Sequence, residues 1–330
     1  MKSLLPKLGL IASILLAQNI YAATPVQVNG QLKVCGKNLC NQFGQVVQLR
    51  GMSTHGLQWY GWGKCVTANA LDVQATYWKS SVVRISLYVQ EGGYETNPTA
   101  FTNQVNTIIR EVTNRGMYAL VDWHILDPGN PNYNLARAKT FFTAVANANK
   151  GKVNLIYEIA NEPNGVSWNT IRNYAEQIIP VIRGIDPNAV IVVGTRGWSS
   201  LGISEGGSPQ EIINNPVRAT NVMYAFHFYA ASHKTEYLNA LNTASNSLPI
   251  FVTEWGSQTY TGGGPNDFTS SNKYIQLMSQ KKISWTNWNW SDDSLSGAIW
   301  KSGACRTNTW PDSSLKESGV YVKQKIINGV

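Results

Sequence analysis

The stretch LIYEIANEPNG, residues 155–165, begins as an apolar and aromatic run and ends on Asn161, Glu162 and Pro163. A continuous apolar run of this length is typical of a strand that is buried on both faces. A carboxylate at the edge of a core is costly unless it is hydrogen-bonded, paired or used. Glu162 is therefore either satisfied by a structural partner or functional, and the rest of the chain has to decide between the two.

Similar segments recur along the chain. Runs rich in β-branched and aromatic residues lie at 46–51, 81–88, 117–124, 153–162, 189–195, 221–229, 249–256 and 283–290. Segments with helical spacing lie between them, most clearly at 97–116 and 168–186. Strands that alternate with helices predict a parallel sheet, and eight such units in about 300 residues fit a (β/α)8 TIM barrel. A doubly wound open sheet is the alternative, but it needs fewer strands, and no G-x-G-x-x-G follows any of them.

The first 22 residues have the pattern of a secretory signal peptide. Lys2 and Lys7 are followed by an apolar segment, 8–16, that is too short to span a bilayer, and Ala22 closes a small-residue cleavage site. An uncleaved anchor is the alternative. We expect bacterial export, a secreted product without membrane attachment, and a single domain over 23–330. The segment 31–40 predicts a short β-hairpin ahead of the barrel.

The four cysteines favour disulfides, because an exported chain with an even number of them usually pairs them. Cys35 and Cys40 flank a turn signal, so one expected bond closes the hairpin, which would leave Cys65 with Cys305. The sequence itself permits three pairings. A zinc site is disfavoured, because no histidine lies at ligand spacing beside the cysteines.

The composition restricts the partners. The chain has 330 residues, of which 43% are hydrophobic and 14% charged, with 12 Trp and 15 Tyr. The formal charge is +8, but no run of Lys or Arg exists, so we expect no nucleic-acid partner. A surface that is low in charge and rich in aromatic and amide groups suits neutral, polyhydroxylated ligands. We expect a monomer.

The barrel predicts that catalytic residues lie at the C-terminal ends of the strands. Polar and aromatic residues gather at those ends: His55, Trp59, Arg84, Trp123, His124, Asn161, Glu162, His227, Tyr229, Glu254, Trp255, Trp288, Asn289 and Trp290. Each of them alone has a structural explanation, but their occurrence on seven strands favours one shared site.

Glu162 and Glu254 end the fourth and seventh strands, which lie across the barrel mouth from each other. Glycoside hydrolysis needs two such carboxyl groups, one protonated and one ionised, with their pKa values pushed apart. Arg84 beside Glu254 would keep that group anionic. The structural alternative is an ion pair between Glu162 and Arg84 inside the barrel. Trp59, Trp62, Trp198, Trp288 and Trp290 offer flat faces for sugar rings, although core packing can explain any one of them.

Six ordered motifs together carry a resemblance: RGMSTHGLQWYG, VRISLYV, YALVDWHILDPGNPN, YEIANEP, AFHFYA and FVTEWG. The chain from about residue 27 to its end resembles glycoside hydrolase family 5 and, within it, the bacterial endoglucanases. NEP alone is a modest signal that several related barrel families share, whereas the ordered set is specific.

The resemblance implies a role for each matching residue. Glu162 would be the acid/base, and Glu254 the nucleophile of a retaining double displacement. Asn161 would bind the sugar 2-hydroxyl, Arg84 and Tyr229 would support Glu254, and His227 and His124 would lie beside them. His55, Trp59 and Trp288 would bind sugars by the same resemblance, and Tyr60, Trp198 and Asp293 are further substrate-binding candidates.

The resemblance further implies a secreted endo-β-1,4-glucanase that acts on cellulose or mixed-linkage β-glucan without a cofactor or metal. One departure concerns SDDSLSG, 291–297, where many relatives read SDKSE; Asp293 and Leu295 replace a Lys and a Glu that reach distant sugars. This departure leaves the contacts to distant sugars and the chain-length preference open. Separately, the same site could instead serve another β-1,4 polymer such as mannan, xyloglucan or chitosan. A non-catalytic sugar-binding barrel and a metal-dependent hydrolase are the remaining alternatives.

Overall fold

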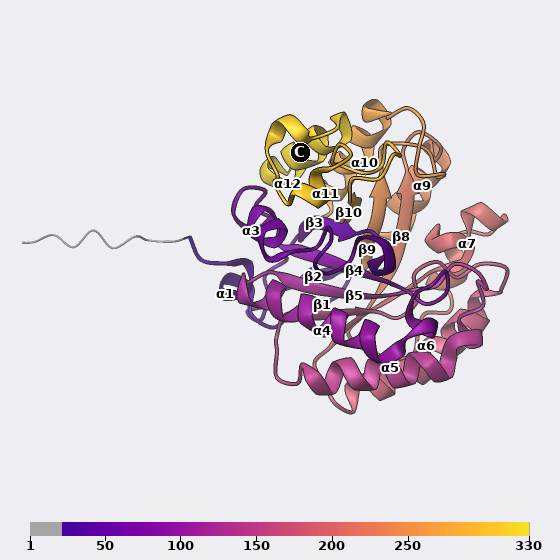
Figure 1. Cartoon of the computed structure of the whole chain (residues 1–330). Coiled ribbons are helices and arrows are strands. Elements are labelled where there is room, and N and C mark those ends of the chain that lie inside the picture. Colours follow the sequence, from indigo (N-terminus) through magenta and orange to yellow (C-terminus); the bar gives the residue numbers. More distant parts are fainter. Residues whose placement is uncertain (1–21, 330) are drawn as a thin grey trace, which may run out of the picture.

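A closed barrel of eight parallel strands forms the centre of the computed structural model, which describes residues 22–329 (Figure 1). The order around the barrel is β10-β3-β4-β5-β6-β7-β8-β9, so each strand pairs with its neighbours in the chain and the last closes on the first. The strands are β3 (Arg50–Thr54), β4 (Val82–Tyr88), β5 (Tyr118–His124), β6 (Leu155–Glu158), β7 (Val190–Val193), β8 (Val222–Tyr229), β9 (Ile250–Gly256) and β10 (Ser284–Trp290). The predicted (β/α)8 fold is confirmed.

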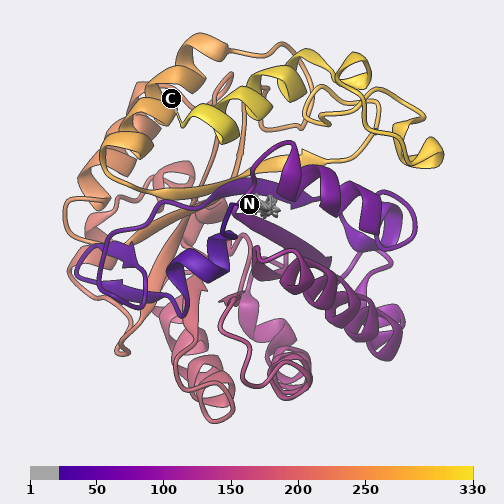
Figure 2. The same ribbon diagram turned by 90° about the vertical axis from the view of Figure 1, so that its left-hand side faces the viewer.

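Helices surround the strands (Figure 2). The longer ones are α3 (Ala68–Thr76), α4 (Pro98–Asn114), α5 (Leu135–Ala148), α6 (Trp168–Arg183), α9 (Thr235–Ala244), α10 (Phe268–Gln280) and α12 (Glu317–Asn328). Short helices in the loops are α2 (Leu57–Tyr60), η1 (Tyr94–Thr96), η2 (Pro131–Asn134), α7 (Arg196–Ser199), η3 (Ile203–Glu205), α8 (Gln210–Ile213), α11 (Ala304–Thr307) and η4 (Asp312–Ser314).

The two helices with the clearest sequence signals begin at side-chain caps. Asn97 accepts a hydrogen bond from Ala100 N at the start of α4, and Ser167 accepts one from Thr170 N at the start of α6. These caps satisfy backbone N–H groups that have no partner within the helix. The buried side of α4 is formed by Val105, Ile108, Ile109 and Val112, which is the spacing of one helix face.

The N-terminal segment covers the end of the barrel opposite the site (Figure 2). It consists of α1 (Pro25–Asn29) and the hairpin of β1 (Lys33–Cys35) and β2 (Asn38–Cys40), which the predicted disulfide Cys35–Cys40 closes. Leu32 and Leu39 are buried against the barrel, and Tyr118 Oη donates to the carbonyl of Gly30 at 2.7 Å. The hairpin therefore closes an end that would otherwise expose core residues.

The first barrel strand was expected at 46–51 but lies at Arg50–Thr54. Val46 instead pairs with Cys40 in antiparallel fashion, and Val47 N donates to the carbonyl of Leu39. The hairpin thus takes the start of this apolar run. The two competing partners, hairpin and barrel, are both β-structure, so residue preference could not separate them.

The barrel interior changes character along its axis. The part nearer the N-terminal ends of the strands is apolar and includes Leu120, Ile156, Val192, Met223 and Phe251. The part nearer their C-terminal ends contains Arg84, Asp122 and Glu158, whose side chains are fully buried. Charges buried in this way are tolerated only when they are paired and hydrogen-bonded. This part of the barrel therefore contains a network of paired polar side chains.

A second disulfide, Cys65–Cys305, joins the loop after β3 to the loop after β10 across a sequence separation of 240 residues. Asp292 supports this junction, because one of its carboxylate oxygens accepts hydrogen bonds from Gly303 N and Cys305 N. The cross-link ties together two loops at the mouth of the barrel. Of the three pairings that the sequence permits, the structure therefore contains Cys35–Cys40 with Cys65–Cys305.

Candidate active site

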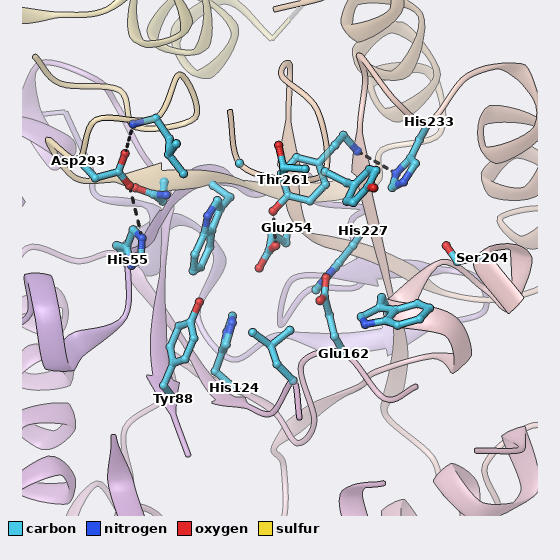
Figure 3. A pocket seen from close by; sticks show the side chains of 18 of the residues that line it. His55, Tyr88, His124, Glu162, Ser204, His227, His233, Glu254, Thr261 and Asp293 are labelled. Carbon is cyan, nitrogen blue, oxygen red and sulfur yellow. Dashed lines mark hydrogen bonds and ion pairs between the residues drawn. The ribbon is translucent and has the colours of Figure 1, made fainter. Parts of the chain in front are cut away.

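A cavity of about 680 Å³ opens at the C-terminal ends of the strands (Figure 3). Residues from the loops that follow the strands and from the strand ends line it: His55, Tyr88, His124, Leu126, Glu162, Trp198, Ser204, His227, Tyr229, His233, Tyr237, Glu254, Tyr260, Thr261, Gly262, Trp288, Asn289, Asp293 and Leu295. This is the end at which barrel enzymes carry their sites.

Glu254 points into this cavity from β9 and is 4% exposed. Arg84 Nη1 donates to its Oε2 at 2.8 Å, and Tyr229 Oη donates to its Oε1 at 2.5 Å. Burial alone raises the pKa of Glu254, but the positive charges of His227 and Arg84 outweigh burial, so its pKa is lowered. Glu254 is therefore an ionised carboxylate with both oxygens held.

Glu162 faces the same cavity from the loop after β6 and is 9% exposed. Its Oε1 lies 2.8 Å from Nδ1 of His227. Burial and the negative charge of Glu254 raise the pKa of Glu162, and the hydrogen bond from His227 offsets part of this effect. The two carboxyl groups thus have pKa values shifted in opposite directions.

The predicted fourth strand was too long. Residues 153–162 were expected to be extended, but β6 ends at Glu158, four residues before Glu162. The chain continues along the barrel mouth, where Ile159 N donates to the carbonyl of Val192 and Asn161 N donates to the carbonyl of Trp123. Leaving the strand ladder places Glu162 above the barrel instead of inside it.

The guanidinium of Arg84 on β4 contacts three carboxylates and one amide oxygen. Its Nε donates to Glu158 Oε2 at 2.6 Å, its Nη1 to Glu254, and its Nη2 to Asn161 Oδ1 at 2.7 Å. Nη2 also lies 3.1 Å from Asp122 Oδ2. Arg84 therefore forms its ion pairs with Asp122, Glu158 and Glu254. The ion pair between Arg84 and Glu162, which was the structural alternative, is not formed.

Sequence reasoning missed Glu158 and Asp122. Glu158 belongs to the quoted stretch, two residues beyond the inward-facing Ile156, and period-2 alternation could have placed it inside the barrel. Asp122 is likewise two residues beyond Leu120 on β5. A charged residue at an inward position of a buried strand was the signal available in both cases.

Asn161 and His124 form a hydrogen-bonded pair with a defined proton arrangement. Asn161 Oδ1 accepts from Arg84, so its Nδ2 is the atom that donates to His124 Nε2, at 3.2 Å. His124 Nδ1 then carries the hydrogen and donates to Asp122 at 2.7 Å. Burial and the charge of Arg84 hold the pKa of His124 well below its usual value, which keeps the ring neutral.

Aromatic rings form one wall of the cavity. Trp288 is 8% exposed, and its ring lies 5.4 Å from that of His124 and 5.2 Å from that of His55. Tyr88, which the sequence did not single out, stacks on His124 at 4.0 Å. Trp59 and Tyr60 do not line the cavity, but their rings lie 5.5 Å and 4.9 Å from the ring of His55.

The wall near Glu162 contains further aromatic residues. Trp198 is 43% exposed and lies in α7 with a left-handed φ of 57°, which is uncommon for a bulky side chain. Tyr260 is 69% exposed, and the rings of His233 and Tyr237 stack at 4.1 Å. Tyr260 and His233 were missed because they lie in loops, and Tyr237 because it lies in the first turn of α9, where the pattern of the strands carries no information.

Asp293 and Leu295, the two residues that depart from the family pattern, both line the cavity. Asp293 Oδ2 lies 3.4 Å from His55 Nε2, and Asp293 Oδ1 accepts a hydrogen bond from Leu295 N. Leu295 is 45% exposed. This part of the wall therefore offers a carboxylate and an apolar side chain to a ligand.

Within the part of the chain that the structure describes, two groups of side chains have ligand atoms close enough to hold a metal ion. Atoms of Glu162, His227 and Glu254 lie within 4.8 Å of one another, as do atoms of Cys65, Asp292 and Cys305. In the second group the cysteine sulfurs are bonded to each other. In the first group the ligand atoms of His227 and both carboxylates are already hydrogen-bonded within the protein.

A (β/α)8 barrel with two buried carboxyl groups of opposite pKa shift in an aromatic-lined cavity is the arrangement of a glycoside hydrolase. The comparison with protein families agrees. Residues 40–294 match the family model described as Cellulase (glycosyl hydrolase family 5), and the chain belongs to this family.

The relatives include bacterial endoglucanases. The chain is 58% identical over 306 residues to endoglucanase MaCel5A of Microbulbifer sp. strain ALW1, and 57% identical over 304 residues to endoglucanase E-5 of Thermobifida fusca. These matches cover 92% of this chain but 60% and 65% of the relatives, so the chain spans under two thirds of their length. The crystal structure of the catalytic domain of Thermobifida fusca endoglucanase Cel5A matches with a TM-score of 0.91 and 56% identity, over 93% of this chain and 100% of that one.

Proposed function

We propose that this protein is an endo-β-1,4-glucanase that hydrolyses internal bonds of cellulose or mixed-linkage β-glucan with retention of configuration. The observation that carries the proposal is the pair Glu162 and Glu254. An oxygen of each lies within 4.8 Å of the other in one cavity, and their pKa values are shifted apart. A close pair of this kind favours double displacement, since inverting enzymes separate their carboxyl groups by about 6.5–9.5 Å to admit a water.

In the first step, ionised Glu254 attacks the anomeric carbon while Glu162 gives its proton to the departing glycosidic oxygen. The carbon–oxygen bond breaks as an ester bond to Glu254 forms. Arg84 and Tyr229 hold both oxygens of Glu254, which fixes the direction of attack.

In the second step, Glu162 removes a proton from water while the water oxygen attacks the anomeric carbon, and the bond from that carbon to Glu254 breaks, which frees the carboxylate. The geometry favours this change of role. The charge of Glu254 is one cause of the raised pKa of Glu162, and that charge is absent once Glu254 is esterified. Glu162 therefore becomes a stronger acid at the stage in which it must act as a carboxylate base.

The surrounding residues would bind the sugar. Asn161 and His124 would meet the 2-hydroxyl of the sugar that is cleaved, Trp288 would lie beneath its ring, and His227 would contact Glu162. His55, Trp59, Tyr60 and Asp293 would bind sugars on one side of the cut, and Trp198 those on the other. A variant of the Thermobifida fusca Cel5A catalytic domain has been solved in complex with cellotetraose, which supports a β-glucan substrate here.

We also propose export of the chain and action as a monomer without a cofactor. The predicted signal peptide, 1–22, falls outside the described residues except for Ala22. Within residues 22–329, no helix has the length and apolar character needed to cross a bilayer.

The polymer is tested by measuring reducing-end release and viscosity loss on a soluble cellulose derivative, mixed-linkage β-glucan, mannan, xylan and chitosan, with and without EDTA. We expect release and a rapid fall in viscosity on the first two, unchanged by EDTA. Glu162→Gln is the blank. Faster release from another polymer would contradict the proposed β-glucan specificity. Inhibition by EDTA would favour a metal-dependent enzyme. Binding of polymer without release of reducing ends would favour a sugar-binding barrel.

A second prediction concerns the loop after β9. Tyr260→Ala should raise KM for soluble glucan by about threefold to tenfold with little change in kcat, because a stacking face for a sugar outside the reacting position is lost. Tyr77→Ala is the matched control, since Tyr77 is 70% exposed, close to the 69% of Tyr260, but does not line the cavity. Equal effects of the two substitutions would contradict a binding role for Tyr260.

A further inference from the structure

His227 is held on both ring nitrogens. Its Nδ1 lies 2.8 Å from Glu162 Oε1, and its Nε2 lies 2.8 Å from the hydroxyl oxygen of Thr253 on β9. His227 is 2% exposed and Thr253 is fully buried. Both contacts are therefore shielded from water, and each nitrogen has one defined neighbour.

Thr253 also contacts Glu158, which the reaction described above does not use. Its hydroxyl donates to Glu158 Oε1 at 2.6 Å, while the other oxygen of Glu158 accepts from Arg84 Nε. Burial alone would raise the pKa of Glu158, but the charge of Arg84 and the contact with His227 lower it to about 2. Glu158 is therefore a buried anion at neutral pH, and it can only accept hydrogen bonds.

The single hydrogen of the Thr253 hydroxyl decides the direction of the next bond. Because that hydrogen is given to Glu158, the oxygen of Thr253 can only accept from His227. His227 Nε2 must therefore carry a hydrogen. Glu158 Oε1 lies 3.7 Å from the same nitrogen, so the anion also acts on the ring directly.

We propose that Glu158 and Thr253 are positioning residues for the acid/base: through the Thr253 hydroxyl they hold His227 as a doubly protonated ring whose Nδ1–H donates to Glu162 Oε1. The inference rests on the proposed function. Oε1 of Glu162 is then occupied as an acceptor, so the proton that goes to the leaving oxygen is carried by Oε2.

The opposite arrangement would hinder the reaction. If His227 were neutral with its hydrogen on Nε2, its Nδ1 would be an acceptor, and protonated Glu162 would turn its own hydrogen toward the ring. That hydrogen would no longer be available to the leaving oxygen. A cationic ring avoids this competition, and burial of the pair makes each such hydrogen bond strong.

The electrostatic surroundings agree with the cationic ring. Burial alone lowers the pKa of His227, but the charge of Glu254 and the contacts with Glu158 and Glu162 raise it to about 9. The charged and titratable groups near the ring come from several elements: Arg84, Asp122, His124, Glu158, Glu162, His233 and Glu254. Among the groups that raise the pKa of His227, the charge of Glu254 has the largest effect, followed by the contacts with Glu158 and Glu162.

The first test is nuclear magnetic resonance of the full chain labelled with nitrogen-15 histidine. The chain has four histidines, and loss of one signal in His227→Gln assigns His227. We expect both ring nitrogens to be protonated at pH 7. In Thr253→Val, which keeps the side-chain shape, the titration midpoint of His227 should fall by about one pH unit, as expected for a lost hydrogen bond to a charged group.

The second test uses rates. Thr253→Val should lower kcat/KM on glucan about tenfold or more, because the leaving oxygen of glucan needs a proton. The loss should be far smaller on dinitrophenyl β-cellobioside, because dinitrophenolate leaves without being protonated. The alkaline limb on glucan should move to lower pH, because the acid/base and His227 lose their first shared proton more readily when the Thr253 hydroxyl no longer accepts from His227 Nε2. Thr253→Ser keeps the hydroxyl, so it should return the alkaline limb to the pH at which it lies in the parent enzyme.

Thr286→Val is the control. Thr286 is also buried on a neighbouring strand, but its hydroxyl donates to the backbone carbonyl of Thr253, and we expect its pH profile to match the parent. A neutral His227 at pH 7, or a Thr253→Val enzyme with unchanged midpoint and limb, would overturn the proposal. Equal rate losses on both substrates without a pH shift would do so too. Absence of glucanase activity in the parent chain would refute the proposed function. The histidine titration would still decide whether His227 is doubly protonated.

Discussion

Replacing Glu254 with Gln should abolish turnover, with kcat on glucan and on dinitrophenyl β-cellobioside both falling by about 10⁴-fold or more. The amide cannot form the ester bond, and a better leaving group cannot compensate for a missing nucleophile. The measurement is kcat on both substrates together with a thermal unfolding curve.

The fold should survive this change. Arg84 keeps its contacts to Glu158, Asp122 and Asn161 when Glu254 becomes neutral. We expect the melting temperature to shift by less than about 5 °C. Glu236→Gln on the exposed side of α9 is the matched control and should behave as the parent does. Near-normal turnover by a folded Glu254→Gln protein would remove Glu254 from the nucleophile role.

Replacing Glu162 with Gln should instead produce a loss that depends on the substrate. On glucan, kcat/KM should fall by about 10³-fold, since a general acid contributes roughly 10²–10⁴-fold. On dinitrophenyl β-cellobioside the first step needs no acid and should continue, while the second step slows because the base is missing. The glycosyl-enzyme should therefore accumulate.

That accumulation is measured as a burst of dinitrophenol and as added mass on the peptide that contains Glu254. Azide, a small nucleophile that needs no base, should release the trapped sugar and restore turnover. Equal losses on both substrates, or no trapped ester, would contradict the division of roles between Glu162 and Glu254. The two Gln variants together thus separate the nucleophile from the acid/base.

Much of this architecture could be predicted from the pattern of buried strands. Six of the eight barrel strands overlap their predicted ranges closely, because a strand covered on both faces reads as a continuous apolar run. The exceptions are informative. The first run, 46–51, was shared between the hairpin and β3, and the fourth was cut short at Glu158. In both cases a tertiary contact, and no residue preference, set the boundary.

The polar network around Arg84 could be predicted less completely from the sequence. The sequence indicated that Arg84, Glu162 and Glu254 meet at one end of the barrel, since all follow or lie in parallel strands. It did not indicate that Glu158 and Asp122 also reach Arg84. Strand alternation tells which side chains face inward, but it does not tell which of them meet across the barrel.

The sequence by itself determined the order of strands and helices, the placement of two carboxylates at the barrel mouth, and the membership of a family of hydrolases. Tertiary structure alone decided the proton arrangement around them. Whether His227 donates to Glu162 depends on Thr253 and Glu158, which come from β9 and β6 and meet at 2.6 Å. Hydrogen bonds act over a few ångströms, and that proximity exists only once the barrel has closed.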